Sequence, residues 1–283
     1  MFENFKLTTK GPSICGYAWE VENPIAVLCI IHGIGEHAGR YDRMATFLGE
    51  SRIAVLSMDL PGHGASEGVR GDAAPRETVL DDVTALIGEG QRRYPGVPLI
   101  LYGHSMGGNI CLDYRSRGEK NTVPAKYIVS APWVRLVRKV SKSLVRAVRA
   151  AARIAPKLAV GNGCSPSDLG SAETGRAYQK DRMVHGKITL RCMIQCFDLG
   201  IALSQGTQPS DHRADDIPTL LMQGDADRIC SPDGARAIAR LQQNNPHFTY
   251  IEWPGYKHEI HNGGDQVNGA KVLETIRDYI IGD

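Results

Sequence analysis

The chain of 283 residues lacks any apolar run that approaches the roughly 20 residues needed by a membrane-spanning helix. Residues 1–6 are not a basic stretch leading into an apolar one, so no secretory signal peptide is visible. The net charge is only +2 at pH 7, which gives no general reason to expect binding to nucleic acid. Internal repeats and low-complexity segments are also absent from the sequence. These absences favour a globular protein of the cytoplasm.

A metal-binding or disulfide pattern is missing as well. The cysteines are odd in number and irregularly spaced, at positions 15, 29, 111, 164, 192, 196 and 230. Cys192 and Cys196 have the spacing of one helix face, but no nearby pair of histidines completes a zinc site. We therefore interpret all seven as reduced thiols and expect no metal ion.

Strands and helices alternate over most of the chain. Continuous apolar runs, typical of strands buried on both faces of a sheet, occupy residues 26–31, 53–58, 97–102, 127–130, 219–222 and 248–251. Helical patterns run from about residue 41 to 49, 75 to 93 and 266 to 281. Such repeated units predict an α/β fold with a mostly parallel central sheet flanked by helices.

This alternation is interrupted between residues 131 and 217. Helical periodicity replaces strands there, apart from a loop-like stretch at residues 161–168. We interpret residues 131–217 as a helical cap inserted into the α/β core, whose two parts are residues 1–130 and 218–283. Because both flanks of the insertion are strand ends at the same sheet edge, the cap is expected to lie over that edge.

One strand–helix turn carries a candidate nucleophile. The pattern Gly-x-Ser-x-Gly at residues 103–107 follows an apolar strand and opens a helix. A turn of this kind exposes the hydroxyl of its serine, here Ser105. Side chains at Gly103 and Gly107 would collide where the strand and the helix approach each other.

A serine nucleophile requires a base, an acid and donors for the oxyanion. The acid is expected after a late strand, where Asp225 and Asp227 compete; we favour Asp227 because the turn at Gly224 must first bring the chain back. The base is expected after the last strand, where His258 and His261 compete, and we favour His258 for its distance from that strand.

Two backbone amides are expected to bind the oxyanion. Met106 directly follows the nucleophile at the start of its helix and supplies one of them. Ile34 supplies the other, because the flanking Gly33 and Gly35 allow that backbone to face inward.

Five stretches together resemble the monoacylglycerol lipase and lysophospholipase branch of the α/β-hydrolase superfamily. They are residues 32–41 (HGIGEHAGRY), 59–68 (DLPGHGASEG), 103–108 (GHSMGG), 223–228 (QGDADR) and 255–258 (GYKH), and they span nearly the whole chain in the order of the family. The resemblance implies Ser105, Asp227 and His258 as the catalytic triad, with Ile34 and Met106 as the oxyanion hole.

The resemblance also places three residues, Glu36, Arg40 and His261, around the alcohol part of the ester. An equally good interpretation is that they support the oxyanion loop without touching substrate. The residues of the cap depart most from the family and are expected to set substrate choice.

A strongly basic helix is predicted in the cap. Eight cations and no acidic residue lie between residues 133 and 157, with apolar residues on another helical face. This pattern suits transient contact with an anionic membrane or micelle surface. It equally suits a solvated lid whose apolar face packs on the core, while nucleic-acid binding is less favoured because no aromatic platform accompanies the charge.

The sequence thus predicts a cofactor-free serine carboxylester hydrolase, cytoplasmic and peripheral at membranes, with a monoacylglycerol as the favoured lipid ester substrate. The alternatives are a lysophospholipase, a short-chain carboxylesterase, a peptidase or a non-catalytic binding protein on a hydrolase scaffold.

Overall fold

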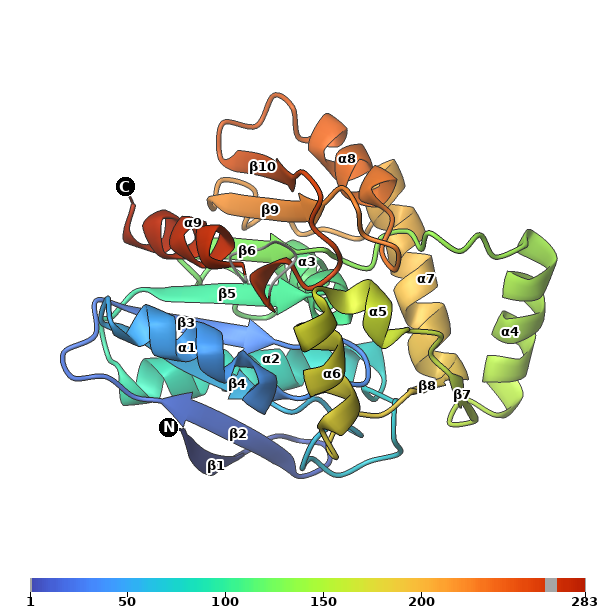
Figure 1. Ribbon diagram of the computed structural model, residues 1–283, viewed down its shortest axis with the longest axis horizontal. Coiled ribbons are helices and arrows are strands. Elements are labelled where there is room, and N and C mark those ends of the chain that lie inside the picture. The colour runs from blue at the N-terminus through green and yellow to red at the C-terminus, as the bar shows by residue number, and fades with distance from the viewer. Residues whose placement is uncertain (1, 263–268, 283) are drawn as a thin grey trace.

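An eight-stranded sheet forms the centre of the protein (Figure 1). The computed structural model describes residues 2–262 and 269–282. The strand order is β1-β2-β4-β3-β5-β6-β9-β10. The strands are β1 (Glu3–Leu7), β2 (Ile14–Trp19), β3 (Ala26–Ile31), β4 (Ile53–Met58), β5 (Leu99–His104), β6 (Lys126–Ser130), β9 (Thr219–Gly224) and β10 (Phe248–Trp253).

The sheet is parallel from β4 to β10, and only the β1–β2 and β2–β4 pairs are antiparallel. The predicted mostly parallel α/β sheet is therefore confirmed.

The two N-terminal strands were not predicted. Most of β1 is exposed and it carries only two large apolar residues, Phe5 and Leu7, so it lacks the continuous apolar run that marks the inner strands.

Helices cover both faces of the sheet (Figure 1). On one face lie α1 (Asp42–Gly49) and α9 (Ala270–Ile281), and on the other lie α2 (Arg76–Arg93), α3 (Met106–Arg117) and α8 (Pro232–Leu241). Two short 3₁₀ turns occupy Ala38–Tyr41 and Ile260–Asn262. The last predicted helix was expected from about residue 266, and residues 266–268 lie outside the described part of the chain.

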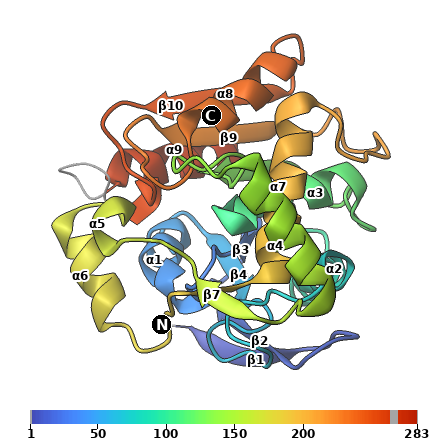
Figure 2. The same ribbon diagram turned by 90° about the vertical axis from the view of Figure 1, so that its right-hand side faces the viewer.

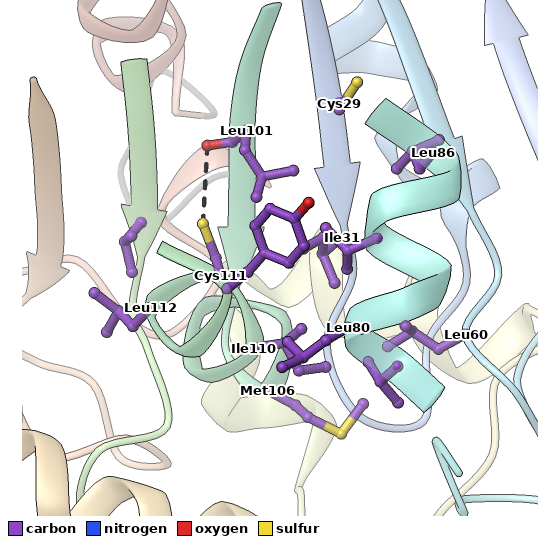
Figure 3. Packing of buried hydrophobic residues seen from close by; sticks show 14 of the residues in the cluster. Cys29, Ile31, Leu60, Leu80, Leu86, Leu101, Met106, Ile110, Cys111 and Leu112 are labelled. Carbon is purple, nitrogen blue, oxygen red and sulfur yellow. Dashed lines mark hydrogen bonds between the residues drawn. The ribbon is translucent and has the colours of Figure 1, made fainter. Parts of the chain in front are cut away.

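The core on the α2 and α3 face fixes the turn that carries Ser105. Figure 3 shows Ile31 and Leu101 of the sheet packed with Leu80 of α2 and Ile110 of α3. All four side chains are at least 95% buried, and each contributes about 1.5–3 kcal/mol through burial. This packing holds β5 and α3 in one arrangement, with the turn between them at the sheet edge.

The chain between β6 and β9 contains four helices and a small two-stranded sheet. The helices are α4 (Lys142–Ile154), α5 (Pro166–Leu169), α6 (Ala172–Lys180) and α7 (Leu190–Gln205), and the antiparallel strands are β7 (Ala159–Gly161) and β8 (Lys187–Thr189). The sequence predicted only helices in this segment, because a strand of three residues is too short to produce a recognisable alternation.

Helix α4 is the outermost element of this segment. It lies beyond α7 at one end of the molecule (Figures 1 and 2), and none of residues 142–154 is buried. Among residues 2–262 and 269–282, no helix has both the length and the apolar character required to cross a membrane.

The glycines of the Ser105 turn are required by close backbone contacts, as expected from the sequence. A Cβ atom at Gly107 would lie 2.0 Å from the carbonyl oxygen of Ile31 in β3. A Cβ atom at Gly103 would lie 2.3 Å from the carbonyl oxygen of Gly107. Helix α3 can approach the sheet this closely only because both positions lack a side chain.

Gly107→Ala is therefore expected to lower the free energy of unfolding by about 3 kcal/mol or more, since the colliding atoms belong to rigid backbone. Gly161→Ala is the matched control, because a Cβ atom there meets no atom within 4 Å. Urea unfolding of both variants tests this contact. Equal midpoints for the two variants would show that α3 can shift without cost.

Candidate active site

Ser105 occupies the turn between β5 and α3 in an unusual backbone conformation. Its φ is 55° and its ψ is −117°, a region that costs a residue with a side chain about 1–3 kcal/mol. Three backbone hydrogen bonds hold it there. The Ser105 amide donates to Ser130 at 3.0 Å, and the Ser105 carbonyl accepts from Asn109 at 3.0 Å and Trp133 at 2.9 Å.

The structure brings Ser105, His258 and Asp227 together in one hydrogen-bonded chain. Asp227 Oδ2 lies 2.8 Å from His258 Nδ1, and His258 Nε2 lies 2.9 Å from Ser105 Oγ. A carboxylate can only accept, so His258 Nδ1 carries the proton and Nε2 is free to accept from the serine hydroxyl. All three side chains are buried.

The loop after β9 holds Asp227 in place. Its Oδ1 accepts from the amides of Ile229 and Cys230, at 2.7 and 2.9 Å. Its Oδ2 also accepts from the side chain of Gln223 at 2.9 Å, a partner that the sequence did not reveal. The competing Asp225 is exposed and accepts from the amide of Gly255 at 2.6 Å, so it supports the loop and does not contact His258.

Two opposing effects act on the pKa of His258. Burial lowers it, but the charge and the hydrogen bond of Asp227 raise it, and the net pKa lies above the usual value. The neighbouring His104, whose ring centroid is 4.8 Å from that of His258, has a pKa well below the usual range because it is fully buried. His104 is therefore neutral at pH 7 and adds no positive charge beside His258.

The loop after β3 brings Ile34 to the same cavity as Ser105. Met106 is the first residue of α3, where backbone amides have no partner within the helix. Gly35, beside Ile34, has a φ of 77° and accepts from the amide of His185 at 2.8 Å. The inserted segment thus holds the Ile34 loop directly through its backbone.

A buried ion cluster supports this loop. Arg40 donates to Glu36 at 2.8 Å and to both carboxylate oxygens of Glu259 at 2.7 and 2.9 Å. Glu36 in turn accepts from the amide of Gly33 at 2.6 Å. Burial raises the pKa of Glu36, whereas for Glu259 the effect of burial is outweighed by Arg40, which lowers the pKa.

Glu259 was missed by the sequence analysis. The sequence shows only a carboxylate directly after the candidate base, and no spacing links it to Arg40. Glu36, Arg40 and Glu259 all line the small cavity at Ser105. They can both support the oxyanion loop and present polar atoms to a ligand.

His261 lies behind the cavity and is not among its lining residues. Its ring stacks on Tyr41 at 5.3 Å between centroids and meets the edge of His104 at 4.8 Å. Burial lowers its pKa to about 3, so the ring is neutral at pH 7. The geometry therefore gives His261 a packing role beside the site.

Two hollows meet at Cys164. The cavity at Ser105, which we call the catalytic cavity, has a volume of about 20 Å³ and admits about one water molecule. A larger apolar pocket of about 550 Å³ lies between α4 and α7. Cys164 lines both hollows, and Leu169 and Tyr178 of the inserted segment complete the catalytic cavity. No pattern in the sequence indicated a role for these three residues.

Within residues 2–262 and 269–282, no three His, Cys, Asp or Glu side chains form a group that could hold a metal ion. All seven cysteines are free thiols.

The sheet and the serine at its strand–helix turn define an α/β-hydrolase, and the chain is a serine hydrolase of the lipase and esterase type. Residues 22–265 match the family described as serine aminopeptidase, S33. The chain belongs to that family.

Relatives in this family include several lipases. The chain is 30% identical to a monoacylglycerol lipase of Mycolicibacterium smegmatis, over 92% of this chain and 89% of the relative. It is 29% identical to phospholipase YtpA of Bacillus subtilis, over 94% of this chain and 100% of the relative. The solved structure of a Saccharomyces cerevisiae monoglyceride lipase variant has the same fold, with a TM-score of 0.84 and 21% identity over 100% of this chain and 95% of that one.

The Asp227 contact generates a prediction for the pKa of His258. In the intact protein, an NMR titration is expected to give a His258 pKa above the usual 6.5, so the ring loses its proton only at higher pH. In Asp227→Asn, burial remains while the compensating charge is gone, so the pKa is expected to fall below 6.5. Asp225→Asn is the matched control and is expected to leave the value unchanged. An unchanged pKa in Asp227→Asn would contradict this account.

Proposed function

We propose that this protein hydrolyses monoacylglycerols to a fatty acid and glycerol, with Ser105 as nucleophile, His258 as base and Asp227 as the orienting acid. The observation that carries the proposal is the continuous chain of hydrogen bonds from Asp227 to Ser105, at 2.8 and 2.9 Å, next to a large apolar pocket. Similarity to lipases that are named for this substrate supports it.

In the first half of the reaction, Ser105 Oγ attacks the ester carbonyl carbon while its proton passes to His258 Nε2. Asp227 stabilises the resulting imidazolium through its Nδ1 proton. The carbon–oxygen bond to glycerol then breaks, and His258 returns the proton to the leaving oxygen. Water attacks the acyl-enzyme in the second half, with His258 again as base, and the fatty acid is released.

The amides of Ile34 and Met106 would bind the oxyanion that forms in both halves. The Met106 amide is at the positive end of the α3 dipole, which favours negative charge. Removing a single donor of this kind costs other hydrolases about 10²–10³ in kcat, so the position of this loop's backbone is itself part of the proposed catalytic machinery. Its support by Glu36 and by the His185 amide agrees with that demand.

The glycerol end of the substrate would lie against Glu36 and Arg40, whose polar atoms line the catalytic cavity. His261 would not contact the glycerol end directly. It would affect the position of that end only through the rings of Tyr41 and His104, against which it packs. The acyl chain would enter the apolar pocket beneath α4. Because the catalytic cavity admits about one water molecule, the Cys164 wall must move before an ester can reach Ser105.

Residues 131–217 would thus act as a cap whose movement admits substrate. Helix α4 carries exposed Leu144 and Ile154 together with many cations, and only Arg149 among the cations of α4 pairs with a carboxylate, that of Asp198, in the described chain. We propose that this helix touches anionic lipid surfaces, with the protein cytoplasmic and peripheral at membranes.

Hydrolysis assays test the reaction. Monoacylglycerols with long acyl chains are expected to be better substrates than p-nitrophenyl acetate, because only long chains fill the apolar pocket. Ser105→Ala is expected to lower kcat by about 10⁴-fold or more and to abolish labelling by a fluorophosphonate. Ser204→Ala, which changes a half-buried serine of α7 that lines neither hollow, is the matched control.

The same assays separate the competing activities. Preferential cleavage of lysophosphatidylcholine would favour a lysophospholipase. The similarity to phospholipase YtpA is the reason to test that substrate. Cleavage of aminoacyl amides alone would favour the peptidase that the family description names. Full fluorophosphonate labelling of Ser105→Ala would refute the assignment of the nucleophile.

Contact with lipid surfaces is tested by vesicle sedimentation. Replacing the exposed Arg146, Arg153 and Lys157 with glutamine is expected to weaken binding to vesicles that contain phosphatidylglycerol, by about 1 kcal/mol for each cation that lies near the surface. Vesicles of phosphatidylcholine alone are expected to bind weakly in every case.

The control variant carries glutamine at Lys6, Arg52 and Arg240, three exposed cations outside the cap. It has the same net charge as the variant with glutamine at residues 146, 153 and 157. Equal loss of vesicle binding in both variants would show that net charge alone, and not α4, is responsible.

A further inference from the structure

Three sulfur-bearing side chains from two helices meet beside the Ser105 turn. Cys192 and Cys196 are one turn apart on α7, so their side chains lie on the same face of that helix. Cys192 Sγ lies 3.4 Å from Sδ of Met106, the first residue of α3. The two thiols also form a hydrogen bond with each other. All three side chains are buried, so a compact group of sulfur atoms lies inside the protein.

The chemistry of these three atoms is that of a soft metal site. No metal ion was expected from the sequence, because no pair of histidines accompanies the two cysteines. The third ligand atom is instead a thioether, from a residue 86 positions earlier in the chain. Thiolate and thioether sulfur together are ligands that select Cu(I), whereas structural Zn²⁺ sites almost always have four nitrogen or sulfur ligands.

The space beside the sulfur atoms suits an ion better than a water molecule. It is a cavity of about 10 Å³, lined by the three sulfur-bearing residues and by apolar side chains such as Val79 and Ile110. A buried water requires at least this much room and two to four polar partners. Bonds from a metal to thiolate sulfur are about 2.3 Å long, so sulfur atoms 3.4 Å apart can bind the same ion.

Arg76 supplies the charge that this ion requires. Its Nη2 lies 3.8 Å from Cys196 Sγ and donates to Asn109 Oδ1 at 2.7 Å. Two deprotonated thiols and one Cu(I) ion carry a net charge of −1, which the guanidinium offsets. The carboxylate of Asp113 lies 3.6 Å from Arg76 and makes its shorter contact, at 2.7 Å, with Arg117. The cation therefore allows the metal–sulfur group to be buried without an unpaired charge.

We propose that Cys192, Cys196 and Met106 form a binding site for Cu(I). On binding, each thiol releases its proton to solvent, and each of the three sulfur atoms donates an electron pair to the ion. The copper stays in the +1 state, so no oxidant or reductant is needed. Binding does not depend on the proposed hydrolysis. It would nevertheless fix the side chain of the residue whose backbone amide is proposed for the oxyanion hole.

Competition with bicinchoninate, in the absence of oxygen and with the intact reduced protein, tests the site. The protein is expected to withdraw a single Cu(I) ion per chain from the bicinchoninate complex. X-ray absorption by the bound copper is expected to show three sulfur neighbours at about 2.3 Å. Failure to withdraw Cu(I), or a copper with nitrogen and oxygen neighbours only, would overturn the proposal.

A double cysteine variant locates the ion. Cys192→Ala combined with Cys196→Ala is expected to weaken Cu(I) binding at least about 100-fold, since even residues behind the ligands typically change metal affinity 10–100-fold. Cys15→Ala combined with Cys164→Ala is the matched control, because it also removes two thiols, and these two cysteines are not fully buried. Equal losses in both double variants would attribute the binding to free thiols in general and refute the site.

Met106→Leu tests the third ligand with little change in side-chain volume. It is expected to weaken Cu(I) binding about tenfold or more and to leave two sulfur neighbours in the X-ray absorption spectrum. Because this variant keeps every cysteine, it remains informative if the double cysteine variant does not fold. Unchanged affinity with three sulfur neighbours would exclude Met106 and overturn the proposed site.

Ser105→Ala separates this site from the proposed function. The serine hydroxyl is not a ligand, so this variant is expected to bind Cu(I) as tightly as the intact protein does. Cu(I) binding by a protein that does not hydrolyse monoacylglycerols would leave the metal site standing and refute the proposed function. Hydrolysis by a protein that does not bind Cu(I) would do the reverse.

Discussion

The close approach of α3 to the central sheet is the constraint on which the site depends. The absence of a side chain at Gly107 lets the start of α3 come against the backbone of β3, and Gly103 lets β5 end directly below it. This contact forces the chain to turn sharply at Ser105, with a φ of 55°. The cost of that conformation is met by the packed residues on either side, so the hydroxyl is aimed before any ligand arrives.

Charge is arranged around this turn so that each group has one role. His258 stays basic because Asp227 offsets its burial, while His104 and His261 stay neutral because burial is not offset for them. The Glu36–Arg40–Glu259 cluster fixes the opposite wall through buried hydrogen bonds. The pKa values of neighbouring imidazoles, and those of Glu36 and Glu259, thus shift in opposite directions because their partners differ.

Much of this arrangement could be predicted from the sequence, because it follows from local rules. Apolar runs gave the inner strands, and the Gly-x-Ser-x-Gly pattern gave the turn at Ser105. The edge strand β1 and the pair β7–β8 could not be predicted, since such short strands have no distinct periodicity. The sequence analysis did not identify the roles of Glu259, Gln223 and Cys164. These roles depend on contacts between distant segments, which no spacing encodes.

Helix α4 has a different relation to the fold from every element around the turn. None of its residues is buried, so substitutions there remove little of the packing that stabilises the protein. Its inner face nevertheless lines the apolar pocket, and its outer face is open to the surroundings. Mutations in α4 can therefore accumulate at little risk to folding while altering what the pocket accepts. The helix is a region in which descendants of this chain could acquire new lipid preferences and keep the same catalytic core.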